Sequence, residues 1–190
     1  MQEKDDILAS GSAQRKALLA QIGYTPKKIC PADIDETCFK DEKPLPYIRR
    51  IARQKAEAVY KLNPSENILS ADTIIVVGQK IIQKSQSPLE QTNVMNLLSG
   101  RTHRVITSVC LIDKNGHISQ KTVTTKIMMK HLTKEEIENY VSSNEWVGVA
   151  GYKIEGLLGG FVKRIVGSYT GVVGLPLYET RNLLIGAGVR

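Results

Sequence analysis

The sequence predicts an α/β protein, and three stretches carry that prediction. Residues 68–77 form an apolar, β-branched run between an Asn-Pro pair and Gly78, which is typical of an inner strand of an α/β sheet. Residues 7–9 predict a short strand that leads directly into a helix over 13–22. Residues 46–62 have the apolar spacing of an amphipathic helix. Strands and helices therefore alternate along the first part of the chain.

Length and composition exclude several classes of protein. A chain of 190 residues can build one sizeable core, or two lobes that share a cleft, and is too short to argue for two independent domains. It has no 18-residue apolar span, and its first six residues are polar and acidic where a signal peptide is basic and then apolar. The three cysteines include no CxxC pair, which disfavours a disulfide framework and a zinc site. We therefore expect a cytoplasmic protein without a membrane partner.

The net charge of +7 indicates a partner of opposite sign. Nucleic acid is disfavoured, because no block of five basic residues occurs and aromatic residues, which stack on bases, make up only 5% of the chain. A few lysines and arginines that converge on a cleft would attract a triphosphate equally well.

Asp72 interrupts the apolar run of residues 68–77. Burying an unpaired carboxylate is costly, so a carboxylate seldom lies in an inner strand for stability alone. Two interpretations remain open. Either the strand ends at Ala71 and Asp72 caps a turn, or Asp72 is a functional residue.

The turn between the first strand and helix contains Ser10 and Ser12 on either side of a glycine. Ser12 is a suitable N-cap, and the helix is expected to end at Gly23. A strand, a small-residue turn and a helix N-terminus can bind an anion, which would also explain Arg15 in the first helical turn. The alternative is a plain N-cap with a solvated arginine. The Gly-Lys-Ser/Thr ending of a Walker loop is absent.

Residues 31–43 form a polar connection rich in carboxylates, including Glu36, and could supply oxygen ligands for Mg²⁺. In the helix 46–62 that follows, Lys55 lies on the apolar stripe and is expected to reach an anion, although it could instead extend to the edge of the stripe. Three arginines of this helix lie off the stripe: Arg49, Arg50 and Arg53.

The middle of the chain predicts alternating strands and helices, with a hairpin turn at 78–79. We expect a strand over 80–82, followed by Lys84, and then a helix from the capping box at 87–90 to Gly100. Strands over 103–112 and 118–129 should follow, and the strand over 118–129 has the polar pattern of an edge strand. A further helix should follow the capping box at 133–136.

The last third is unusually rich in glycine, with eight of the 15 glycines between 148 and 174. Apolar residues are interleaved with these glycines as in strands, and the density of glycine suggests backbone that approaches a ligand or another subunit. The interleaved residues are Ile154, Phe161, Val162, Ile165 and Val172. A final helix is expected to start at Pro176.

Five segments combine small residues with single charges in a distinctive order. They are 8–19 (Leu-Ala-Ser-Gly-Ser-Ala-Gln-Arg-Lys-Ala-Leu-Leu), 71–73 (Ala-Asp-Thr), 98–107 (Leu-Ser-Gly-Arg-Thr-His-Arg-Val-Ile-Thr), 150–156 (Ala-Gly-Tyr-Lys-Ile-Glu-Gly) and 167–176 (Gly-Ser-Tyr-Thr-Gly-Val-Val-Gly-Leu-Pro). In order and spacing this chain resembles the Maf family, whose members were named as septum-formation inhibitors and act as nucleoside triphosphate pyrophosphatases.

The resemblance implies one domain over 1–190, with two lobes around an elongated mixed sheet flanked by helices and a central cleft, as in the inosine-triphosphate pyrophosphatases. It also implies a divalent metal, Mg²⁺ or Mn²⁺, a nucleoside triphosphate substrate that is hydrolysed to the monophosphate and pyrophosphate, and a homodimer.

Carried over by position, the family's catalytic residues fall on Asp72, Glu36, Lys55 and Lys84, with Asp72 as proton acceptor and Asp72 and Glu36 as metal ligands. The substrate-binding residues fall on Ser10, Ser12, Arg15, Gln14, Thr73 and Glu155.

Substrate preference is the part of the pattern from which this chain departs. Thr73 matches the group that prefers thymidine and uridine triphosphates, whereas Gln14 replaces an arginine or large aromatic residue and Glu155 replaces a glutamine. A carboxylate at 155 can only accept hydrogen bonds, which alters the base edge that it can recognise. Ala13 and Val149 replace a proline and a lysine that are common in the family.

Two other functions compete with this one. The first is a non-catalytic regulator of septum formation that binds nucleic acid or a division protein through its basic surface. The second is a pyrophosphatase for inosine or xanthosine triphosphates.

Overall fold

The computed structural model describes residues 6–189 and contains a seven-stranded mixed sheet in the order β2-β1-β3-β5-β6-β7, with β4 paired to β3. The strands are β1 Asp6–Leu8, β2 Lys28–Ile29, β3 Asn67–Val77, β4 Lys80–Ile82, β5 Thr102–Ile112, β6 Ile118–Met129 and β7 Val162–Val166. β1 is parallel to β2 and β3, and the remaining pairs are antiparallel. The predicted α/β class, with a mixed sheet flanked by helices, is confirmed.

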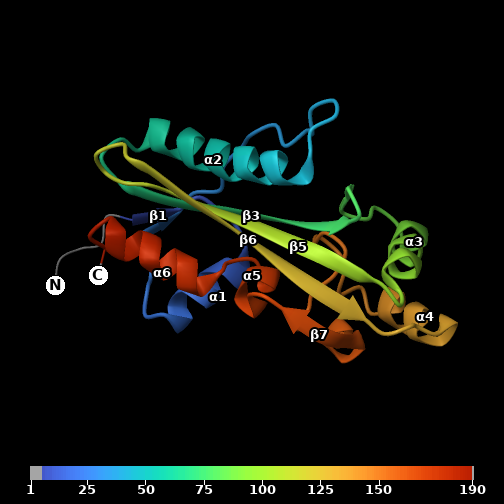
Figure 1. Cartoon of the computed structure of the whole chain (residues 1–190). Helices are drawn as coiled ribbons and strands as arrows, with labels where there is room; N and C mark the ends of the chain where they lie inside the picture. The colour runs from blue at the N-terminus through green and yellow to red at the C-terminus, as the bar shows by residue number, and fades with distance from the viewer. Residues whose placement is uncertain (1–5, 190) are drawn as a thin grey trace.

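Helices cover both faces of the long central strands. They are α1 Ala13–Gln21, α2 Pro44–Leu62, α3 Pro88–Leu98, α4 Lys134–Ser142, the 3₁₀ helix η1 Leu157–Phe161, α5 Tyr169–Val173 and α6 Leu177–Gly186. Figure 1 shows α2 along one side of the sheet and α1, α5 and α6 on the other, with α3 and α4 together at one end. Residues 1–5 and 190, which belong to the predicted domain, lie outside the described part.

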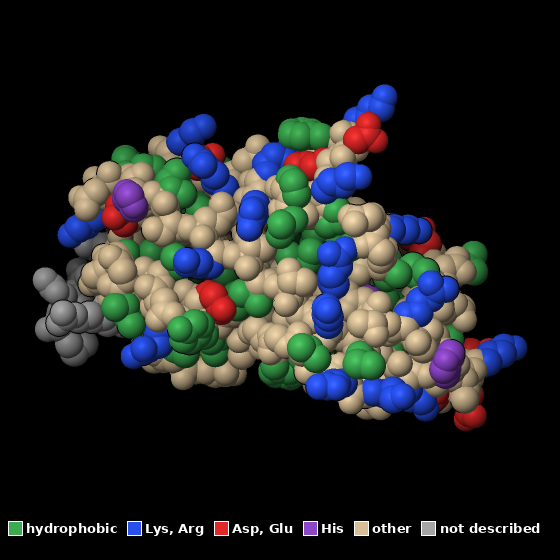
Figure 2. All heavy atoms as spheres, in the orientation of Figure 1, with side chains coloured by type: hydrophobic (Ala, Val, Ile, Leu, Met, Phe, Trp, Pro, Cys, Tyr) green, Lys and Arg blue, Asp and Glu red, His purple; other side chains and the backbone are tan. Residues whose placement is uncertain are grey.

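The predicted apolar stripe of α2 is confirmed, because Ile48, Ile51, Ala52, Ala56 and Val59 are all buried. On the face in Figure 2, Lys and Arg side chains are distributed among hydrophobic and uncharged side chains. Within residues 6–189, none of the helices has the length and apolar character needed to cross a membrane.

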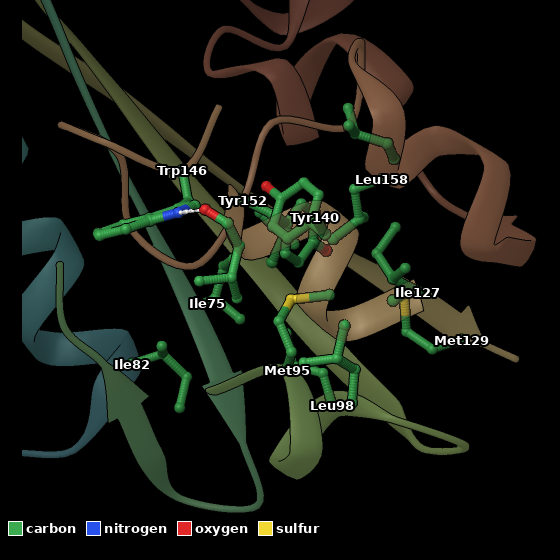
Figure 3. Packing of buried hydrophobic residues seen from close by; sticks show 14 residues of the cluster. Ile75, Ile82, Met95, Leu98, Ile127, Met129, Tyr140, Trp146, Tyr152 and Leu158 are labelled. Carbon is green, nitrogen blue, oxygen red and sulfur yellow. Dashed lines mark hydrogen bonds between the residues drawn. The ribbon is translucent and has the colours of Figure 1, made fainter. Parts of the chain in front are cut away.

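A buried apolar cluster joins α3 and α4 to the sheet and to the segment that follows α4. Met95 and Leu98 come from α3, Tyr140 from α4, and Trp146 and Tyr152 from the following segment (Figure 3). The indole Nε1 of Trp146 also donates to the carbonyl oxygen at position 141, at 2.9 Å. These contacts hold the irregular segment 146–156 against the sheet.

The glycine-rich last third differs from the prediction. Only Val162 and Ile165 lie in a strand; Ile154 is in a turn, Phe161 ends η1 and Val172 lies in α5. α5 forms because the Ser168 side chain accepts a hydrogen bond from the backbone N–H of residue 171 as an N-cap. Local capping therefore prevails over the strand-like spacing.

Two smaller predictions also need correction, and one short strand had no prediction. β6 is an edge strand along only part of its length, because Lys126–Met129 pairs with β7. β2 has only two residues, too few for a periodic pattern, and was not predicted. The capping box at Ser87 is half formed, because the Glu90 carboxylate accepts from the N–H of Gln86 instead of that of Ser87.

Candidate active site

Arg15 is folded back across the turn between β1 and α1. Ser12 caps α1 by accepting from the Arg15 N–H at 3.3 Å. The guanidinium donates to Ser10 Oγ at 2.9 Å, to the Gly174 carbonyl oxygen at 3.0 Å and to Thr73 Oγ1 at 3.5 Å. Burial lowers the pKa of Arg15, while Asp72 and Glu36 raise it, and an arginine remains charged at neutral pH. The alternative of a solvated arginine is therefore wrong.

Asp72 lies within β3 and faces Ser108 of β5 in the sheet register. The strand therefore continues past Ala71, and the interpretation of Asp72 as a turn cap is wrong. Its side chain is 13% exposed, and its Oδ1 accepts a hydrogen bond from Lys55 Nζ at 2.7 Å.

Lys55 connects two carboxylates that lie far apart in the sequence. Besides Asp72, its Nζ contacts Glu36 Oε1 at 2.9 Å, and its side chain is 12% exposed. The Lys55 ammonium therefore contacts two carboxylates of the protein, and its contact with a substrate anion stays a prediction. The pair Asp72 and Glu36 also defines the place where a divalent cation could bind.

A chain of hydroxyl groups fixes the orientation of Thr73. Thr107 Oγ1 donates to the Gly171 carbonyl oxygen at 2.7 Å and lies 2.9 Å from Thr73 Oγ1. Because a hydroxyl has one proton, Thr107 must accept from Thr73. Thr73 therefore presents only acceptor lone pairs to Arg15 and to anything beside it.

These groups surround one cleft of about 790 Å³. Every predicted site residue lines it: Ser10, Ser12, Gln14, Arg15, Glu36, Lys55, Asp72, Thr73, Lys84 and Glu155. The predicted approach of glycine backbone to a ligand site agrees with Gly148 and Gly174, which line the same cleft. Lys84, two residues after β4, forms an isolated bridge with Ala150 and joins the chain there to this glycine-rich segment.

Sequence reasoning missed two cleft residues of particular interest, Tyr47 and Lys153. Lys153 lies inside the segment 150–156 that carries part of the family resemblance, so its charge could have identified it as a candidate phosphate-binding residue. Tyr47 precedes the predicted apolar stripe of α2, and no local pattern distinguished it from a core residue.

The residues present fit a magnesium or manganese ion. Two carboxylates contact the same ammonium and could take up a cation in its place. Among residues 6–189 no group of three or more His, Cys, Asp or Glu side chains is placed to hold a metal. Mg²⁺ is often bound by one or two carboxylates with the remaining ligands from phosphates and water, so two are sufficient.

Comparison with known proteins places the chain in a family. The Maf family model, described as Maf-like protein, matches residues 6–187. The chain is 47% identical over 189 residues to a dTTP/UTP pyrophosphatase of Rhodopseudomonas palustris, covering 96% of this chain and 91% of the relative. It is 46% identical over 185 residues to the protein of the same name from Caulobacter vibrioides, covering 97% and 96%.

Solved structures give a more distant likeness. The nucleoside-triphosphatase (dITP/XTP pyrophosphatase) of Mycobacterium abscessus has a TM-score of 0.43 at 12% identity, covering 65% of this chain and 72% of that one. The Staphylococcus aureus Ham1 protein has a TM-score of 0.48 at 14% identity, covering 65% and 71%. The family match and the identity to the two relatives over nearly their whole lengths show that the chain belongs to the Maf family.

Proposed function

We propose that this chain is a nucleoside triphosphate pyrophosphatase. It hydrolyses the bond between the α and β phosphates and releases a nucleoside monophosphate and pyrophosphate. The observation that carries the proposal is one cleft in which Lys55 joins Asp72 to Glu36 beside Arg15 and Lys84. The names of the relatives support the same reaction.

The cationic residues meet the main electrostatic demand of this chemistry. A triphosphate repels a nucleophile, and negative charge moves onto the departing pyrophosphate. Arg15 of α1, Lys55 of α2 and Lys84, which follows β4, line the cleft and would neutralise that charge. Ser10 and Ser12, with the N–H groups at the start of α1, would hold phosphate oxygens.

The carboxylates provide the other half of the mechanism. Asp72 would accept a proton from the attacking water as the water oxygen bonds to phosphorus and pyrophosphate leaves. Its place within β3 keeps it fixed for this role. Glu36 would orient that water. Asp72 and Glu36 would also hold the divalent cation, Mg²⁺ or Mn²⁺, which supplies further neutralisation of the phosphate oxygens.

We propose pyrimidine triphosphates of the dTTP and UTP type, or modified nucleotides, as substrates. Thr73 accepts hydrogen bonds, and Glu155 is an exposed carboxylate that only accepts. The Gln14 amide oxygen accepts from the Ser12 hydroxyl at 3.3 Å, which leaves its N–H groups as donors. These three groups would set base preference.

A panel of common, deaminated and modified triphosphates tests the reaction and its specificity. Pyrophosphate and orthophosphate are scored separately with Mg²⁺, and Asp72→Asn is measured beside the wild type. We expect pyrophosphate from pyrimidine triphosphates and at least a hundredfold loss in the variant. A preference for inosine or xanthosine triphosphate would contradict the proposed specificity.

The alternative of a non-catalytic regulator is disfavoured, because the charged residues that it leaves unexplained all line one cleft. On the face in Figure 2, the basic side chains are also spread out, not gathered in one nucleic-acid-binding block. Salt-sensitive DNA binding that Asp72→Asn leaves unchanged would favour the regulator.

The remaining features of the proposal concern organisation. We propose a single domain over 1–190 with two lobes that share the cleft, a homodimer and a cytoplasmic location. The three free thiols Cys30, Cys38 and Cys110 support that location. Light scattering coupled to size exclusion tests the dimer.

A further inference from the structure

The loop that carries Glu36 is held by residues that the mechanism above does not use. Residues 31–43 contain no helix or strand apart from a short turn near Lys40. The Glu36 side chain is 49% exposed, against 13% for Asp72. Core packing therefore does not fix Glu36, and its position depends on what ties the loop to α2.

Arg50 makes the largest set of these contacts. Its Nε and Nη2 donate to the two carboxylate oxygens of Glu42 at 2.8 and 2.6 Å. Nη2 also donates to the Thr37 carbonyl oxygen at 3.1 Å, the residue next to Glu36. The side chains of Arg50 and Glu42 are 17% and 9% exposed. The hydrogen bond to Arg50 lowers the pKa of Glu42 to about 2, so the pair remains ionised at neutral pH.

The same guanidinium also holds the tip of the loop. The Cζ atom of Arg50 lies 3.8 Å from the centroid of the Phe39 ring. Phe39 is 60% exposed, so burial does little to fix it, whereas a cation–π contact does. The backbone N–H of Phe39 also donates to Glu42 Oε2 at 3.1 Å. One arginine therefore contacts three residues of the loop: Thr37, Phe39 and Glu42.

Tyr47 holds the backbone of Glu36 itself. Its hydroxyl donates to the Glu36 carbonyl oxygen at 2.9 Å, and its ring is buried in the first turn of α2. Burial and the nearby charges of Asp72 and Glu36 raise the pKa of Tyr47 to about 12. The hydroxyl therefore keeps the proton that it donates.

We propose that Arg50 and Tyr47 are positioning residues that set the Glu36 carboxylate against Lys55 and Asp72. Neither needs to touch the reacting atoms; they act through the backbone carbonyl groups of Glu36 and Thr37. The proposal rests on the proposed function, in which Glu36 takes part in hydrolysis. Lysine cannot replace Arg50, because a single ammonium cannot make two parallel bonds to Glu42 and also reach Thr37.

A double-mutant cycle tests whether Arg50 acts through Glu36. We expect Arg50→Lys to lower kcat about tenfold to a hundredfold, as small displacements of a catalytic group do. In a Glu36→Gln background, Arg50→Lys should lower kcat by less than about twofold. Tyr47→Phe should behave in the same way. If Arg50 has only a structural role, Arg50→Lys will lower kcat by the same factor with Glu36 and with Gln at position 36, and that result would overturn the proposal.

Arg53→Lys is the matched control. Arg53 lies on the same helix, pairs with Glu57 at 2.7 Å and does not line the cleft. It should change kcat by less than about twofold. Hydrogen exchange supplies a readout other than activity: amides over 36–42 should exchange faster in Arg50→Lys than in wild type or Arg53→Lys. Unchanged exchange in Arg50→Lys would also overturn the proposal.

The activity of the wild type distinguishes a failure of the proposed function from a failure of the positioning role alone. If it releases no pyrophosphate from any triphosphate, the proposed function fails and the positioning role fails with it. If the wild type is active and Arg50→Lys matches Arg53→Lys in kcat and exchange, the positioning role alone is overturned.

Discussion

Lys55→Met is the substitution that most directly probes the charge balance of the cleft. Methionine keeps most of the side-chain volume and removes the ammonium between Asp72 and Glu36. The contact with Asp72, whose side chain is 13% exposed, is a charge-assisted hydrogen bond worth about 1.5–3 kcal/mol. Glu36 is half exposed, so solvent screening reduces its contact to about 0.5 kcal/mol.

Removing the cation also leaves the two carboxylates close together without compensation. We therefore expect Lys55→Met to lower the free energy of unfolding by about 2–4 kcal/mol without metal, which corresponds to roughly 5–12 °C in a domain of this size. Added Mg²⁺ should recover part of the loss and raise the Tm of the variant more than that of the wild type, because a bound cation replaces the missing charge.

The assay is thermal unfolding followed by circular dichroism, with EDTA and with Mg²⁺. Lys61→Met, at an exposed position in the last turn of the same helix, is the control and should shift the Tm by less than about 2 °C. If the Lys55→Met protein is as stable as wild type in EDTA, or its Tm responds no more strongly to Mg²⁺, then Lys55 does not balance the charges of Asp72 and Glu36.

Three further predictions follow from buried groups. Thr107→Val leaves the hydroxyl of Thr73 without its acceptor and should lower stability by about 1–3 kcal/mol in urea titrations and raise the KM for dTTP; an unchanged KM would separate Thr73 from base recognition. Gly151→Ala should lower the free energy of unfolding by about 1–3 kcal/mol, because Gly151 has a φ of 71° and a Cβ there would lie 2.7 Å from Ile75 Cδ1. A decrease in the urea midpoint smaller than that of Gly186→Ala, at an exposed position, would contradict this. Burial lowers the pKa of His103 to about 4, so the unfolded chain binds the extra proton between pH 6.5 and 4. Stability should therefore fall by about 3 kcal/mol as pH drops through that window, and His103→Gln should flatten the dependence.

Much of the fold was predictable because local chemistry and global packing agree. The Ser12 cap, the apolar stripe of α2 and the reciprocal capping box at Thr133 and Glu136 each form as expected. β3 was predictable from its β-branched run, and Asp72 was singled out because it is expensive in such a strand. Those signals lie within single elements of the chain.

The unpredicted features depend on contacts between distant segments. Arg50 lies off the apolar stripe of α2, and its partners belong to an irregular loop that has no periodicity. The hydroxyl chain from Thr73 to Gly171 joins β3, β5 and α5, and its two hydrogen bonds span 34 and 64 residues of the sequence. Val172 lies in a helix because of a side-chain cap at Ser168, a local hydrogen bond that hydrophobic spacing does not report.

The residues of the cleft were predictable as a set only from the resemblance to the Maf family. Residue types alone left Asp72, Arg15 and Lys55 each with two interpretations. The structure brings all three to one cleft and removes the alternatives of a turn cap and a solvated arginine. Their roles in hydrolysis remain proposals.

The pyrophosphatase reaction itself can be tested by incubating wild type and Asp72→Asn with dTTP and Mg²⁺ and resolving the phosphate products. We expect equimolar thymidine monophosphate and pyrophosphate from the wild type, and a loss of at least about a hundredfold in the variant. Release of orthophosphate with the diphosphate, or equal turnover by both proteins, would contradict it.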